Sequence, residues 1–442
     1  MQTWITSGVR CPRRRTRHNL LLQTPKNWFM STARPAFDSR VAPVQRAACE
    51  PVHEEKDRRR LSVLQLGMEW FPEKPGGLDR YYYELLKVLP ACGVECQGLI
   101  VGTDAAATAT LGRVRAFAAP SQSVVGRCLA ARRVTRESLE SRRFDLVTAH
   151  FALYAFPSIR SFGDLPFVTH FHGPWGAESR MEGGARLASW GKSRLERAVY
   201  RRADRLICLS TAFARILERD YGVPGDRIRV IPGGIDANRF DIPETRMQAR
   251  SRLGWPTGRP IVLCVRRLVR RMGLENLIDA AAILRRAVPD VLIYMAGRGP
   301  IRGDLQARIE ASGLQDTCKL LGFVPDDDLP LAYRAADVTI VPSVALEGFG
   351  LVAAESLAAG TPALVSNVGG LPEAVSPLCH ELVVPSVSAA PLAESLRDAV
   401  LGTFLVPSAM ACATYARTRF QWPSIVGRIR AVYDEACGKR AV

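Results

Sequence analysis

Residues 342–373 constrain the fold of this chain more than any other stretch, and they read PSVALEGFGLVAAESLAAGTPALVSNVGGLPE. They follow Val338–Val341, a mainly β-branched run that predicts a buried strand. The apolar spacing from Leu351 onward predicts a helix that begins at about Gly350 and ends at Gly360. A strand that leads through a glycine-rich turn straight into a helix is typical of a parallel α/β sheet.

Two carboxylates flank the predicted start of this helix: Glu347 in the preceding loop and Glu355 on the second turn. Gly348 and Gly350 allow a tight turn and a close approach of the backbone to a ligand. The free amides of a helix N-terminus bind anions, and carboxylates accept hydrogen bonds from hydroxyl groups. The pattern therefore predicts a sugar-nucleotide site. The alternative is a helix cap at Glu347, a solvated Glu355 and a plain turn, but the neighbouring strand and glycine motifs favour the site.

The stretch EGFGLVAAESLAAGTPALVSNVGGLPE resembles the donor-site signature of the retaining glycosyltransferases of family four, the group 1 glycosyltransferases, which have the glycosyltransferase-B fold. The resemblance covers about Leu61 to Ala436. It implies that Glu355 holds the ribose and that Glu347 binds hydroxyls of the transferred sugar. It also implies a donor-binding loop made of Gly348, Phe349, Gly350 and Leu351, whose amides stabilise the departing diphosphate.

Strands alternate with helices from Leu61, and the alternation restarts after a polar connector that ends near Pro260. Only helices and loops are expected in 103–143, which is rich in Ala, Ser and Arg. The predicted fold is α/β, with two doubly wound Rossmann-like domains facing across a cleft. The expected parts are a disordered basic extension (1–60), an acceptor-side Rossmann-like domain (61–240), a nucleotide-sugar-binding Rossmann-like domain (241–405) and C-terminal helices that cross back to the first domain (406–442), anchored by Trp422.

The chain has a net charge of +17, and residues 1–60 carry +8 of it, from thirteen Lys or Arg and five Asp or Glu. This balance favours anionic partners, so we expect a membrane surface or a lipid-phosphate acceptor. No nucleic-acid partner is expected, because no RNA-binding module or DNA-reading helix is apparent. The eleven scattered cysteines are expected to be reduced thiols. The chain also has no apolar run of about 18 residues, the length needed to span a bilayer. These two features indicate a cytoplasmic protein, peripheral to the membrane.

Gly76 and Gly77 follow the first predicted strand and come directly before a helix. At the carboxyl end of a parallel sheet, this position suits a close backbone approach to an anion. The resemblance places this loop beside the donor phosphates and the acceptor. A plain turn is the alternative.

Three histidines follow or end neighbouring strands: His150, His170 and His172. Strand alternation puts His170 and His172 on one face, but a third zinc ligand is not apparent. His172 matches the histidine that lies beside the transferred sugar in the resembling family, so it is the catalytic candidate together with Glu347. His170 is expected in the core, and His150 either lines the cleft or packs.

The stretch CVRRLVRRMGLENLI places two pairs of arginines between a strand and a helix. Guanidinium groups suit a diphosphate. Arg267 matches the family arginine, whereas Met272 stands at the family lysine and Arg266 at the family glycine. We expect Arg271 to supply the second charge and Arg270 to be exposed.

Gly297 and Gly299 form a strand-end loop that borders the nucleotide in the resembling family, and residues 322–324 lie near the base. Asp326–Asp328 superficially match an acidic metal motif, but they stand directly before a predicted helix. We interpret them as N-capping residues and expect no metal. No cofactor is expected besides the donor substrate.

Together these features predict a retaining glycosyltransferase that moves a hexose-type sugar from a nucleotide diphosphate sugar to a hydroxyl acceptor in polysaccharide or glycolipid assembly. The acceptor is expected to be a carbohydrate or lipid-linked. One alternative is a nucleotide-sugar epimerase or a phosphorylase on the same fold. Another, motivated by Met272, is a non-catalytic binding protein.

Overall fold

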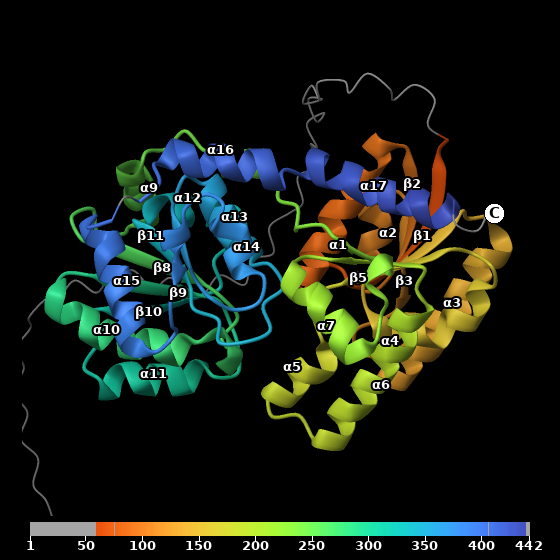
Figure 1. Ribbon diagram of the computed structural model, residues 1–442, viewed down its shortest axis with the longest axis horizontal. Coiled ribbons are helices and arrows are strands. Elements are labelled where there is room, and N and C mark those ends of the chain that lie inside the picture. Colours follow the sequence, from red (N-terminus) through yellow and green to blue (C-terminus); the bar gives the residue numbers. More distant parts are fainter. Residues whose placement is uncertain (1–58, 75, 405, 439–442) are drawn as a thin grey trace, which may run out of the picture. The chain divides into compact units, whose positions relative to one another are not determined.

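The computed structural model describes residues 59–74, 76–404 and 406–438 (Figure 1). Nearly all of the predicted extension, 1–60, lies outside these residues.

The first sheet has seven parallel strands in the order β3-β2-β1-β4-β5-β6-β7. Its strands are β1 Leu61–Glu69, β2 Val94–Val101, β3 Val114–Ala118, β4 Leu146–Ala149, β5 Phe167–Phe171, β6 Arg205–Cys208 and β7 Ile228–Val230. The order reverses between β1 and β4, so the chain switches direction of winding there. Ligands of such sheets bind outside the carboxyl ends of the strands at this switch point.

The second sheet has six parallel strands in the order β10-β9-β8-β11-β12-β13, with its own reversal between β8 and β11. Its strands are β8 Ile261–Val265, β9 Leu292–Ala296, β10 Cys318–Gly322, β11 Val338–Val341, β12 Ala363–Ser366 and β13 Val383–Val384. Both sheets have the doubly wound order, which confirms the predicted fold class of two Rossmann-like domains.

The α-helices of the described chain are α1 Gly77–Val88, α2 Ala105–Ala109, α3 Val124–Ser141, α4 Ala152–Ala155, α5 Trp175–Met181, α6 Arg186–Arg202, α7 Thr211–Tyr221, α8 Ala237–Phe240, α9 Arg246–Leu253, α10 Leu274–Ala287, α11 Arg302–Ala311, α12 Leu329–Ala335, α13 Leu351–Ala358, α14 Leu371–Val375, α15 Ala389–Leu401, α16 Ala409–Phe420 and α17 Trp422–Gly438. Short 3₁₀ turns are η2 Leu89–Cys92, η3 Phe156–Phe162, η4 Gly225–Arg227, η5 Arg270–Met272 and η6 His380–Leu382. Hydroxyl caps begin several helices. The Ser210 hydroxyl accepts from the Phe213 N–H, and Thr245 forms a capping box with Gln248.

Strand β3 corrects the expectation of helices and loops alone in 103–143. Its five residues, VRAFA, pair only with β2 at the edge of the first sheet. Val114 and Phe117 are buried. So short a segment takes its strand conformation from pairing with β2, which local periodicity does not reveal.

Helix α17 packs on the first sheet, although it follows the second sheet in the sequence (Figure 1). Trp422, at its first position, is buried and lies in one apolar cluster with Tyr81, Val168 and Ile425. This contact agrees with the expected crossing back of the C-terminal helices. The predicted domain boundaries themselves stay predictions.

Within the described residues, no helix is both long enough and apolar enough to cross a bilayer.

Candidate functional site

The loop before α13 holds Glu347 at the carboxyl end of β11. Leu346 has φ 52° and Gly350, the N-cap of α13, has φ 81°, so the loop turns sharply twice around Glu347. The Gly370 N–H donates to the Glu347 carbonyl at 2.9 Å, and an added Cβ at Gly369 would overlap that carbonyl. Gly369 and Gly370, the two glycines of GGLPE, therefore support the backbone of Glu347.

Glu355 lies on the second turn of α13, as the sequence predicts, and is buried. The Tyr333 hydroxyl donates to its Oε2 at 2.9 Å. Burial raises the pKa of Glu355, although Arg80 and the Tyr333 hydroxyl act in the opposite direction. Its carboxylate is held in place and faces a pocket.

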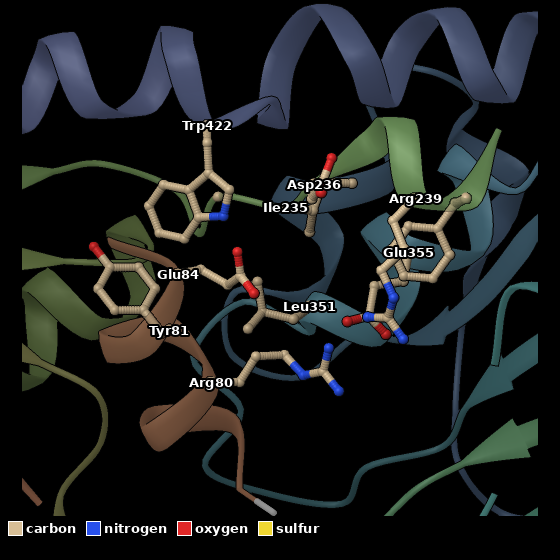
Figure 2. Close-up of a pocket in the computed structure, with 11 residues that line it drawn as sticks. Arg80, Tyr81, Glu84, Ile235, Asp236, Arg239, Leu351, Glu355 and Trp422 are labelled. Carbon is tan, nitrogen blue, oxygen red and sulfur yellow. The ribbon is translucent and has the colours of Figure 1, made fainter. Parts of the chain in front are cut away.

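Figure 2 shows that pocket, to which α1, the segment after β7, α13 and α17 all contribute side chains. In this view Arg80 lies at the lower centre and Arg239 at the right, with Glu355 beside Arg239. The lining residues are Arg80, Tyr81, Glu84, Gly234, Ile235, Asp236, Arg239, Phe240, Leu351, Glu355 and Trp422.

Asp326 shows that the capping interpretation of Asp326–Asp328 is wrong. Asp328 is the N-cap of α12, but no side-chain hydrogen bond caps that helix. Asp326 instead forms ion pairs with Arg80 and Arg239, two residues of the pocket. The Asp326 carboxylate pairs with guanidinium groups from α1 and α8 instead of capping α12.

The arginine-rich loop after β8 turns its side chains in different directions. Arg266 is buried, and its Nη2 contacts Glu347 Oε2, donates to Ser343 Oγ at 2.6 Å and lies 2.7 Å from Met272 Sδ. Burial opposes ionisation of Glu347, but the Arg266 guanidinium, helped by Arg271 and the Ser343 hydroxyl, holds the pKa of Glu347 below its usual value.

Arg271 is also buried and points toward α5. It pairs with Glu178 at 3.3 Å and Glu182 at 3.1 Å and donates to the Leu346 carbonyl at 3.2 Å. The side chain of Arg267 is exposed and makes no hydrogen bond or ion pair with any described residue. Arg270 is exposed, as predicted, and pairs with Glu275 and Asp304.

Of the other glycines predicted to bind the donor, Gly76 and Gly297 are required by packing, whereas Gly77 is not. Gly76 is the N-cap of α1, and a Cβ there would meet the Asp79 carboxylate. Burial raises the pKa of Asp79 to about 7. Gly77 is the first residue of α1, with open space around it. Gly297, with φ 145°, lies so close to the Arg266 carbonyl that a side chain would overlap it.

The three histidines form a stack beside Tyr81, at the carboxyl ends of β4 and β5. His150 Nδ1 lies 3.2 Å from His172 Nε2, and His150 Nε2 lies 3.0 Å from Gln65 Oε1. The Thr148 hydroxyl also donates to Gln65 Oε1, at 2.7 Å. His170 is buried, as expected.

Burial lowers the pKa of all three histidines, and the value for His172 falls to about 3. At neutral pH each imidazole therefore has one donor and one acceptor nitrogen. Because Gln65 Oε1 accepts, His150 donates from Nε2 and accepts at Nδ1. His172 then donates from Nε2, which leaves its Nδ1 as an acceptor.

Metal binding has no support from this cluster. Nowhere in 59–74, 76–404 or 406–438 do three His, Cys, Asp or Glu side chains gather in a way that could hold a metal ion.

Several residues of the site were not predicted from the sequence: Gln65, Arg80, Ser343, Tyr333 and Tyr433. Gln65 alone had a visible signal, since it is the one polar residue inside the apolar run of LSVLQLG after Ser62. Tyr433 of α17 reaches this network through His170, 3.0 Å from its hydroxyl. No local pattern indicates such contacts, because they join distant segments.

Two family models match the chain. The model described as "Glycosyltransferase Family 4" matches residues 75–239, and "Glycosyl transferases group 1" matches residues 245–419. The first match includes β2 to β7 of the first sheet but not β1, and the second includes all six strands of the second sheet.

Curated relatives point the same way. The D-inositol 3-phosphate glycosyltransferase of Nocardiopsis dassonvillei is 32% identical over 320 residues, 69% of this chain and 73% of the relative. The mannosylfructose-phosphate synthase of Agrobacterium fabrum is 35% identical over 198 residues, 42% of this chain and 43% of the relative. For that synthase and for the D-inositol 3-phosphate glycosyltransferase of Thermobispora bispora, the match spans about half of the relative, 43% and 56%.

Solved structures share the fold at low identity. HepE of Anabaena, in complex with UDP and glucose, is 21% identical with a TM-score of 0.69, covering 85% of this chain and 100% of that one. Sucrose-phosphate synthase of Thermosynechococcus elongatus is 22% identical with a TM-score of 0.69, covering 85% and 99%.

Proposed function

The chain belongs to the group 1 glycosyltransferases of the glycosyltransferase-B fold, and from this premise we propose that it transfers a hexose-type sugar from a nucleotide diphosphate sugar to a hydroxyl acceptor. One observation carries the proposal. Glu347 and Glu355 flank the N-terminus of α13, while Arg266, Arg267 and Arg271 gather at the carboxyl end of the neighbouring strand β8. Carboxylates for hydroxyls and cations for a diphosphate thus lie together.

The donor would lie with its ribose at Glu355 and its sugar at Glu347. Glu355 is locked by Tyr333, so it offers Oε1 to a ribose hydroxyl. Glu347 Oε2 is taken by Arg266 and Ser343, while Oε1 has no hydrogen bond among the described residues. An ionised carboxylate with one free oxygen is a strong acceptor for sugar hydroxyls.

The departing diphosphate would be stabilised by the amides at the start of α13 and by Arg267, which is exposed and unpaired among the described residues. Preorganised donors of this kind stabilise charge that develops on a leaving group. No metal is needed in this scheme.

We propose retention of the anomeric configuration by front-face transfer. No carboxylate on the acceptor side is assigned as a nucleophile. The leaving phosphate would therefore take the proton of the acceptor hydroxyl. His172, neutral with Nδ1 as an acceptor, would orient a sugar hydroxyl rather than supply a proton. An inverted product linkage would overturn this mechanism.

For the acceptor we propose a phosphorylated or lipid-linked hydroxyl compound, used in polysaccharide or glycolipid assembly. The names of the relatives, D-inositol 3-phosphate glycosyltransferase and mannosylfructose-phosphate synthase, support a phosphorylated acceptor. The surface of α6 supports a lipid-linked one. Leu187 and Trp190 are 78% and 60% exposed there, beside exposed Arg186 and Arg194, which have no acidic partner in the described chain. An interfacial Trp with cations suits an anionic membrane.

The test is a panel of uridine, guanosine and adenosine diphosphate sugars offered to the purified full chain, with binding measured by calorimetry. UDP-glucose comes first, since HepE was solved with it. Inositol phosphate, fructose phosphate and polyprenyl phosphate acceptors follow, and the product anomer is determined by NMR.

Matched variants locate the donor. Glu355→Ala should weaken binding of the free nucleotide diphosphate and of the nucleotide sugar alike, about 10- to 100-fold, because a charge-assisted hydrogen bond contributes roughly 1.5–3 kcal/mol. Glu347→Ala should weaken the nucleotide sugar only. Glu394→Ala, an exposed site on α15, is the control. Conversion of the donor without acceptor would indicate an epimerase, dependence on inorganic phosphate a phosphorylase, and binding without turnover a scaffold.

A further inference from the structure

Arg266 occupies an unusual place in the site. It follows β8 directly, and its side chain is only 7% exposed. Three groups surround its Nη2: the Glu347 carboxylate, the Ser343 hydroxyl and the Met272 thioether. Its Nε is buried and has no hydrogen-bond partner within the described part of the chain. A buried guanidinium held by one carboxylate is costly, because the desolvation of two charges can exceed their mutual attraction.

Met272 and Arg266 compete for the same space. The Met272 sulfur lies 2.7 Å from Arg266 Nη2, and Met272 is buried. A lysine at 272 would extend its ammonium group into the place that the guanidinium now fills, within reach of Glu347. The thioether carries no charge, so this pocket holds one cation, and it comes from residue 266.

The other buried arginine of the loop is committed elsewhere. Arg271 faces Glu178 on α5 and Glu182, the C-cap residue of that helix, so two carboxylates offset its charge. Its pairing connects the η5 turn to α5. Among the residues that the structure describes, Arg266 has only Glu347 as an ionic partner.

We propose that Arg266 is the positioning residue of the sugar-binding carboxylate and the second cation of the donor site, in the role expected of Arg271. Arg266 and Ser343 hold Glu347 Oε2, so that Oε1 is presented to the sugar hydroxyls already ionised. The same guanidinium adds positive potential beside the leaving diphosphate, next to Arg267. This inference deepens the proposed function and rests on it for the donor.

The decisive experiment moves the cation from one position to the other. Arg266→Gly should lower kcat/KM for the donor about 100-fold, with most of the loss in kcat, since a misplaced carboxylate affects the transition state. Met272→Lys in the Arg266→Gly background should recover activity to within about tenfold of the parent. Met272→Lys alone places two cations in one pocket and should itself reduce activity.

Arg271→Ala is the comparison. It should change kcat/KM less than Arg266→Gly does and should not be rescued by Met272→Lys. Two results together would overturn the assignment in favour of Arg271. The double variant would have a kcat/KM no higher than that of Arg266→Gly, and Arg271→Ala would lower kcat/KM more than Arg266→Gly does.

A second measurement needs no donor. Thermal unfolding of Arg266→Ala, Glu347→Gln and their combination, in the ligand-free chain, tests the pair directly. The double variant should lose clearly less than the sum of the single losses. Additive losses would show that Arg266 does not hold Glu347. If the parent binds no nucleotide sugar, the proposed function fails while this cycle still decides the pairing.

Discussion

His150 Nδ1 lies 3.2 Å from His172 Nε2, while the other nitrogen of His150 meets Gln65 Oε1 at 3.0 Å. Through this relationship a glutamine in the middle of β1 determines which nitrogen of His172 is free to accept. Gln65 Nε2 in turn donates to the Tyr433 hydroxyl of α17 at 3.4 Å. The tautomer of His172 thus depends on residues from both ends of the described chain.

Replacing Gln65 should therefore impair turnover, although Gln65 itself is not expected to contact the substrate. Gln65→Leu removes the acceptor for the His150 Nε2–H, and we expect kcat to fall about 10- to 100-fold, equivalent to roughly 1.4–2.7 kcal/mol, with a nearly constant donor KM. The free energy of unfolding should also fall by about 1–3 kcal/mol, because buried partners lose their hydrogen bonds. Steady-state kinetics and denaturant unfolding measure the two effects.

Two controls separate positioning from stability. Gln65→Glu keeps an oxygen acceptor and should retain more activity than Gln65→Leu. Gln97→Leu changes a part-buried glutamine of β2 that bonds Ser138, and it should leave kcat unchanged. Equal losses for Gln65→Leu and Gln65→Glu would argue against the tautomer account.

The buried histidines should make the chain less stable in mild acid. Their pKa values are lowered in the folded state, while in the unfolded chain they are about 6.5. As the pH falls below about 6.5, the unfolded state gains protons that the folded state does not, so stability is lost. Each such group contributes up to roughly 1.4 kcal/mol per pH unit.

Denaturant unfolding between pH 7 and pH 5 measures this slope. His150→Gln should reduce it by up to one proton, whereas His380→Gln, at an exposed position, should not. An unchanged slope in His150→Gln would contradict neutral burial of that residue.

Trp422 should be essential for stability because it anchors α17. It packs against Tyr81 with ring centroids 5.4 Å apart, and an added Cβ at Gly234 would overlap its indole. Trp422→Ala should cost about 3–5 kcal/mol, as truncation of a buried aromatic residue typically does. The control Trp190→Ala removes an exposed tryptophan and should change stability by no more than about 0.5 kcal/mol. Similar losses for both variants would contradict the anchoring role.

The α6 surface should bind anionic membranes. We expect the full chain to co-sediment with phosphatidylglycerol-containing vesicles, less so at high salt, and not with pure phosphatidylcholine. Arg186→Ala with Arg194→Ala should weaken binding about 30-fold, since each cation near the surface contributes roughly 1 kcal/mol. Trp190→Ser should weaken it further, whereas Met410→Ser, which changes an even more exposed apolar side chain on α16, should not. Unchanged binding in the arginine variant would exclude this surface.

Much of the donor loop was predictable from local residues. The helix beginning at Gly350, Glu347 before it and Glu355 on its second turn all follow from apolar spacing and glycine chemistry, which act over a few residues. The end of β4 before His150 and the start of α1 after Gly76 were also predictable for the same reason. The misses have another cause. Strand β3 depends on pairing with β2, and Asp326 exchanges a local cap for Arg80 and Arg239.

The α/β class, the alternation of strands and helices and the position of both carboxylates follow from the order of the residues, because periodicity and turn chemistry are encoded in neighbouring residues. Which arginine meets Glu347 depends on the three-dimensional fold. Residues 266, 267 and 271 are all arginines, and they lie close together in the sequence. The backbone after β8 nevertheless turns Arg266 toward Glu347, leaves Arg267 exposed and directs Arg271 toward α5. Such partners are chosen by distance in space, and a guanidinium pairs with the carboxylate that the fold brings within reach.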